Sequence, residues 1–109
     1  MTNSRAKGAA AEREFASRHL AVYWPEVGRN VDQYGQDKRD LIRCGGVHWQ
    51  CKRQERLNIW AALNQAQQEA IGGDLPVVAF RRNRSSWYVA LAADDFVPLL
   101  AVALRASGG

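Results

Sequence analysis

Four polar residues in the first half of the chain have the types needed for phosphodiester hydrolysis. They are Glu12, Asp40, Gln50 and Lys52. Two carboxylates and an amide supply oxygen ligands, which Mg²⁺ and Mn²⁺ prefer. A bound metal activates water, and a lysine stabilises the charge that develops on the phosphate. Each residue alone is ordinary on a solvated helix or strand, so the prediction depends on their joint occurrence.

Glu12 is expected on an N-terminal helix over residues 5–22. This segment is rich in alanine and free of proline, which favours a helix. Trp24-Pro25 closes it, and a polar stretch over residues 28–38 follows. Apolar residues at helical spacing, which should form the buried face of this helix, are Ala11, Phe15, Ala16 and Leu20.

Asp40, Gln50 and Lys52 are expected on a β-hairpin that turns at Gly45-Gly46. Side chains alternate along a strand, so Gln50 and Lys52 point to one face. A regular two-residue turn would place Asp40 opposite Cys51 and therefore on the other face. A three-residue loop or a bulge would shift the register by one and bring Asp40 beside the pair. The metal-site hypothesis therefore requires an irregular hairpin.

The remaining elements complete a mixed α/β domain. Gly72-Gly73 should end the second helix, and Asp94 should cap a short last helix with Pro98 in its first turn. The order α-β-β-α-β-β-α predicts a small four-stranded mixed sheet flanked by helices, in one domain over residues 1–109 with its core over 5–93. The elements expected after the first helix cover residues 40–44, 47–52, 58–71, 75–82, 87–92 and 94–105.

These residues and this order of elements resemble the PD-(D/E)xK nuclease superfamily. Within it, the chain is most similar to the archaeal-type Holliday junction resolvases and the small resolvase-like endonucleases of phages. The resemblance extends over residues 7–91 and implies a restriction-endonuclease-like core. The motifs that carry it are Lys7-Gly8-x-x-Ala11-Glu12-Arg13-Glu14, Asp40-Leu41 and Gln50-x-Lys52.

The resemblance implies that Glu12 and Asp40 help to hold Mg²⁺ or Mn²⁺, and that Lys52 orients water or stabilises charge. Gln50 stands where most members have Glu or Asp, so the site loses a negative charge and should bind metal more weakly. As a neutral ligand, Gln50 would still contribute its oxygen, and we expect an active enzyme. A junction resolvase must cut two strands symmetrically, so a homodimer is expected.

Residues around the proposed site are candidates for DNA contacts, because Lys and Arg neutralise phosphates. Arg29 and Gln33 precede Asp40 in a loop where resolvase-like enzymes contact DNA. The cluster at residues 81–84 belongs to a hairpin tip and is the weaker candidate. The residues expected to contact DNA are Lys7, Arg29, Gln33, Lys38, Arg39, Arg53 and Arg56.

The composition of the chain indicates a globular protein. The 109 residues are 47% hydrophobic and 24% charged, as in globular rather than disordered chains. The net charge of +4 suits a polyanionic partner such as DNA. No apolar run approaches the ~18 residues of a membrane span, and the first residues lack the apolar core of a signal peptide. We therefore expect no membrane association and a location in the cytoplasm of a bacterial or phage-infected cell.

Other interpretations stay open. A nicking or restriction-like phage endonuclease would use the same residues on duplex or single-stranded DNA. A DNA-binding module of the same fold, catalytically weakened at Gln50, would bind DNA independently of Mg²⁺. A structural protein with an incidental motif would have no affinity for DNA. The cysteines and histidines lack the paired spacing of a zinc site, so no structural zinc is expected.

Overall fold

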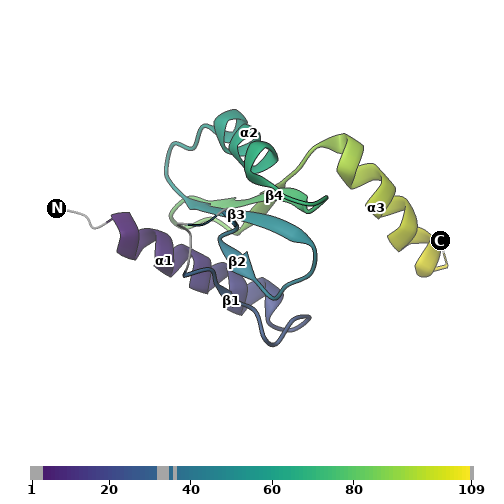
Figure 1. Cartoon of the computed structure of the whole chain (residues 1–109), viewed down its shortest axis with the longest axis horizontal. Coiled ribbons are helices and arrows are strands. Elements are labelled where there is room, and N and C mark those ends of the chain that lie inside the picture. Colours follow the sequence, from purple (N-terminus) through teal and green to yellow (C-terminus); the bar gives the residue numbers. More distant parts are fainter. Residues whose placement is uncertain (1–3, 32–34, 36, 109) are drawn as a thin grey trace.

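The computed structural model describes residues 4–31, 35 and 37–108. It shows a mixed α/β fold in which two helices cover a small sheet and a third projects outward (Figure 1). The elements are α1 (Ser4–Phe15), the π-helical turn η1 (Ala16–Leu20), β1 (Gly28–Arg29), β2 (Leu41–Ile42), β3 (Val47–Arg53), α2 (Ile59–Glu69), β4 (Leu75–Arg81), β5 (Tyr88–Ala90) and α3 (Ala93–Ala106).

The helices α1 and α2 pack on opposite faces of the sheet formed by β3, β4 and β5 (Figure 1). Strand alternation explains the two cores. Val77 and Ala79 face the cluster that contains α1, while Val78 lies in the cluster with α2. The four residues predicted for the buried face of the first helix are all buried, which confirms that prediction: Ala11, Phe15, Ala16 and Leu20.

The sheet is mixed, as the sequence predicts. β3 and β4 are parallel, from the Val47–Leu75 pair to the Arg53–Arg81 pair. α2 makes the crossover that parallel neighbours need. β5 returns antiparallel beside β4, which confirms the predicted second strand pair.

The predicted four-stranded sheet with a hairpin turning at Gly45-Gly46 is wrong in detail. The described residues form a two-stranded and a three-stranded sheet, and β2 pairs with β1 rather than with β3. Arg43 and Gly45 adopt positive φ angles of 61° and 81°, which break a regular ladder before β3 begins. β1 arises in the polar stretch for which the sequence indicated no strand.

The boundaries of the last two helices also differ from prediction. α2 ends at Glu69, before the turn that contains Gly72 and Gly73. α3 begins one residue before Asp94, and its N-cap position is Ala92, which makes no side-chain capping bond. Pro98 therefore lies inside the helix rather than in its first turn. Among the helices described, none combines the length and apolar character that a membrane span needs.

Candidate active site

A cavity of about 340 Å³ opens between α1 and the last residues of β3. Three of the four residues singled out for chemistry line it, and they come from three separate parts of the chain. The complete lining is Gly8, Ala11, Glu12, Asp40, Cys51, Lys52, Arg53 and Gln54. Small residues on α1 leave this space open, because neither Gly8 nor Ala11 has a side chain long enough to fill it.

Asp40 is held by hydrogen bonds on three sides. Its backbone N–H donates to the Trp49 carbonyl at 2.9 Å, and its own carbonyl accepts from the Asn30 N–H at 3.0 Å. Its carboxylate Oδ2 accepts from the backbone N–H of Cys51 at 2.7 Å. The connection to β3 is irregular, as the hypothesis requires, but it brings the Asp40 carboxylate to the backbone of Cys51 and not to the side chain of Gln50.

The environment of Asp40 disfavours its charged form. Burial raises the pKa of Asp40 to about 7, and the neighbouring charges of Glu12 and Glu69 act in the same direction. The hydrogen bond from Cys51 and the charge of Lys52 oppose this shift but do not cancel it. A cation in the cavity would relieve the repulsion and favour the carboxylate.

Glu12 lies on the buried side of α1, with 8% of its surface exposed. Arg29 on β1 donates its Nε to Glu12 Oε2 at 2.7 Å. This ion pair connects the short β1–β2 sheet to the cavity. Arg29, predicted to contact DNA, therefore also holds one of the two carboxylates.

Gln50 does not line the cavity with the other three residues. It is 3% exposed and pairs in register with Val78, on the sheet face that α2 covers. Its Nε2 lies 2.9 Å from His48 Nε2 and donates to Glu69 Oε2 at 2.9 Å. The Gln50 amide is therefore fixed between its own strand and the end of α2.

His48 is fully buried beside this amide. Burial lowers the pKa of His48, although the nearby Glu69 and Asp37 charges pull in the opposite direction. A neutral imidazole can accept a hydrogen bond from Gln50 at one ring nitrogen.

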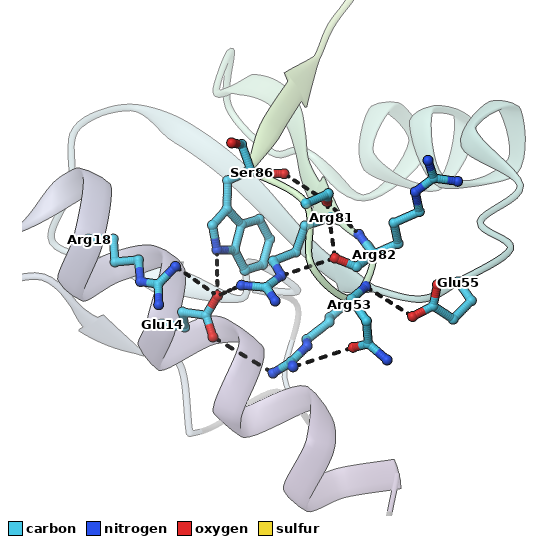
Figure 2. A network of polar contacts seen from close by, with 10 residues as sticks. Glu14, Arg18, Arg53, Glu55, Arg81, Arg82 and Ser86 are labelled. Carbon is cyan, nitrogen blue, oxygen red and sulfur yellow. Dashed lines mark hydrogen bonds and ion pairs between the residues drawn. The ribbon is translucent and has the colours of Figure 1, made fainter.

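Glu14 lies on α1 about one turn beyond the cavity. Its carboxylate forms ion pairs with three arginines (Figure 2). It is paired with Arg81, and its carboxylate lies 3.6 Å from Arg18 and 3.7 Å from Arg53. Burial alone raises the pKa of Glu14, but a hydrogen bond from Trp87 and the three guanidinium charges together lower it. The network holds Arg53 at the rim of the cavity.

The other predicted DNA contacts occupy varied positions. Arg39 is bound to the Asp37 carboxylate through two hydrogen bonds of 2.9 and 2.7 Å, so its charge is compensated. Arg56 is exposed and Lys38 is half-buried. Lys7 lies on α1, but its side chain and the whole of Gln33 are outside the described residues.

Some residues that shape the site were missed at the sequence level. Asn30 is buried and donates its side-chain amide to the carbonyls of Asp37 and Arg39, which holds the segment before Asp40. The contact between His48 and Gln50 could have been predicted from sequence, because the two residues are two positions apart and therefore share one face of the strand. Glu69 carries no local signal, because only the packing of α2 brings it to Gln50.

Comparison of the chain with family models, curated proteins and solved structures gave no match.

Proposed function

We propose that this protein is a metal-dependent DNA endonuclease with a restriction-endonuclease-like core, selective for branched DNA such as a Holliday junction. The observation that carries the proposal is the shared cavity of Glu12, Asp40 and Lys52. These residues come from α1, from the segment before β2 and from β3, in the order that the sequence resemblance requires. Two carboxylates and a lysine in one solvent-accessible cavity are the groups needed for phosphodiester hydrolysis.

Glu12 and Asp40 fit the role of ligands for Mg²⁺ or Mn²⁺. Both residues line the cavity, and the negative charge of Glu12 contributes to the raised pKa of Asp40. When bound, such a metal supplies a more acidic water and a positive charge at the scissile phosphate. Among the described residues, no three His, Cys, Asp or Glu side chains form a metal site by themselves, so oxygen atoms of other types would complete the coordination.

Gln50 is the proposed source of a further, neutral oxygen. Its amide nitrogen is engaged by His48 and Glu69, so its oxygen is the atom left for a cation. Gln50 is not among the residues that line the cavity, so its side chain would have to move from its contact with Glu69 toward Asp40 when a metal binds.

Lys52 and Arg53 supply the positive charge. Lys52 lines the cavity beside Asp40 and would stabilise the negative charge that grows on the phosphate. Arg53 lies at the rim, and Arg56 follows in an exposed turn. These groups would neutralise phosphates beside the scissile bond.

A cleavage assay on a labelled four-way junction and a matched linear duplex tests the proposal. Each substrate is incubated with Mg²⁺, Mn²⁺ or EDTA. We expect paired, symmetric cuts in the junction that require the metal and are lost in Asp40→Asn and Lys52→Ala. Asp74→Asn, at the equivalent place before β4, serves as the control that keeps activity. Equal cutting of both substrates would replace junction selectivity with a general endonuclease.

A catalytically weakened DNA-binding module is the second candidate. The amide at position 50 and its place outside the cavity lining favour this alternative. It predicts that DNA binds equally well in Mg²⁺ and EDTA and is not cut in either. The same assay, read by gel shift as well as by cleavage, separates the two functions.

A further inference from the structure

The C-terminal helix α3 is unusual because the structure leaves it uncovered. None of its residues is buried, and it projects away from the rest of the fold (Figure 1). A helix that is apolar over most of its circumference is normally buried against other protein. Its exposed large apolar side chains are Phe96, Val97, Leu99, Leu100, Val102 and Leu104.

The surface area of the whole chain also indicates that part of it is normally covered by another protein. A compact monomer of 12.2 kDa exposes about 6,100 Å². This chain exposes 7553 Å², which leaves an excess of roughly 1,500 Å². Its radius of gyration is 14.3 Å, against about 13 Å for a compact chain of this length. A standard protein interface buries about 800 Å² on each partner, so the excess is large enough for a stable dimer.

The charges on α3 favour another copy of itself over a polyanion or an acidic lipid surface. The helix carries Asp94 and Asp95 in its first turn and Arg105 in its last. This charge balance offers no attraction to phosphates. Opposite charges at the two ends are instead self-complementary when two such helices run antiparallel.

One stripe of α3 has the spacing that such a pair needs. Asp95, Leu99, Val102 and Arg105 follow one another at intervals of four, three and three residues, which places them along one side of a helix. Leu99 and Val102 are 50% and 64% exposed. A two-fold axis near residue 100 would put the apolar residues in contact and bring each Asp95 to the opposite Arg105.

We infer that α3 is a dimerisation helix, which pairs antiparallel with α3 of a second copy through Leu99 and Val102 and is closed at each end by an Asp95–Arg105 ion pair. This inference does not depend on the proposed nuclease activity. Its test needs neither DNA nor metal, so the two proposals can fail separately.

Sedimentation equilibrium over a range of protein concentrations tests the pairing. The unmodified chain should have the mass of a dimer at micromolar concentration. Val102→Glu should raise the dimer dissociation constant at least tenfold. Trp60→Glu serves as the matched control, because Trp60 is 79% exposed on α2, and it should leave the dimer intact. Circular dichroism verifies that each variant keeps its helix content.

Charge exchange tests the antiparallel orientation. Arg105→Glu should weaken the dimer, and adding Asp95→Arg to the same chain should restore it. Oxidation should cross-link Leu99→Cys across the two-fold axis but not Ser107→Cys at the helix end. Both native cysteines are buried and should not interfere.

Three results would overturn the inference. The first is a monomer at every concentration. The second is an open-ended assembly in place of a closed pair. The third is cross-linking through Ser107→Cys, because only parallel helices bring the two copies of residue 107 together.

Discussion

Asp40 lies in a part of the cavity where a carboxylate behaves differently from one in solution. Its carboxylate is held by a backbone N–H at 2.7 Å, yet burial and neighbouring negative charges raise its pKa to about 7. The hydrogen bond fixes its position, while the charge of Lys52 compensates the negative charge only in part. A group in this state binds a cation with a gain in stability and is costly to ionise without one.

The first prediction concerns the pH dependence of stability without divalent metal. The pKa of Asp40 is raised from its ordinary value of 3.8 to about 7 in the folded state. Its contribution to the free energy of unfolding is therefore largest below pH 4 and is lost as the pH rises through 7. Asp40→Asn removes this loss, so the variant should gain stability relative to the unmodified protein between pH 5 and pH 8.

Urea denaturation in EDTA at pH 5 and pH 8 measures the effect. Asp74→Asn is the control and should keep the pH dependence of the unmodified protein. Identical dependence in Asp40→Asn and the unmodified protein would show that Asp40 does not titrate in this range.

A second prediction concerns Gln50 and Glu69. Gln50→Glu alone places a second carboxylate against Glu69 Oε2, which Gln50 Nε2 now contacts at 2.9 Å, and this should destabilise the metal-free protein. Combining it with Glu69→Gln restores an amide–carboxylate pair with the charge at position 50. If Gln50 is a metal ligand, the double variant should reach half-maximal cleavage at a lower Mg²⁺ concentration.

Titration of Mg²⁺ in the cleavage assay checks this, with Glu69→Gln alone as the control. An unchanged Mg²⁺ requirement in the double variant, with activity intact, would remove Gln50 from the coordination shell.

At the scale of elements, short segments do most of the positioning. β1 and β2 contain two residues each, but they bring Arg29 to Glu12 and align Asp40 with β3. The connection from β2 to β3 contains two residues at positive φ. This connection, rather than a regular turn, allows the Asp40 carboxylate to reach the backbone of Cys51.

A third prediction compares one substitution in two elements. Gly8 lies inside α1, and a Cβ added there meets no atom within 4 Å. Gly8→Ala should therefore stabilise the fold by about 0.5–1 kcal/mol through helix propensity. Gly45 has a φ of 81°, so Gly45→Ala should destabilise it by about 1–2 kcal/mol.

Chemical denaturation of both variants measures the two effects in one experiment. A loss of stability in Gly8→Ala would mean that α1 packs more closely at this position than the structure shows. No loss in Gly45→Ala would mean that the turn relaxes without cost.

At the scale of the whole molecule, the proposed nuclease activity and the proposed dimerisation through α3 are compatible. The cavity lies beside α1, whereas the proposed dimerisation helix follows β5 and projects outward from the rest of the fold (Figure 1). A dimer formed through α3 would carry two cavities, one on each copy. Symmetric cleavage of a branched DNA needs two such sites in one assembly.

The fourth prediction follows from this arrangement. Val102→Glu should separate the copies without altering Glu12, Asp40 or Lys52, so metal-dependent cutting should persist. Paired cuts in a four-way junction should give way to single nicks, because each copy then acts alone. A time course that resolves nicked from fully cut junction measures this, with Trp60→Glu as the control. Undiminished pairing of cuts in monomeric Val102→Glu would separate dimerisation from cleavage.

The local pattern of the chain was sufficient to predict most elements. Helical spacing identified α1 and its buried face, and short apolar stretches on either side of turn residues identified β3, β4 and β5. These predictions succeed because a helix or strand buries one side of a repeating pattern. The type and order of Glu12, Asp40 and Lys52 also come from sequence, although their role in catalysis stays a prediction.

Only the tertiary structure decided which segments pair and what the polar residues contact. The sequence predicted a hairpin across Gly45-Gly46, but β2 pairs with β1, because partner choice depends on long-range contacts that no local pattern encodes. Packing of α2 sets Glu69 against Gln50 and turns this amide away from the cavity that the other three residues share. The exposure of α3 has the same origin: the sequence predicted the helix, but only the assembled fold shows that its apolar side chains are left uncovered.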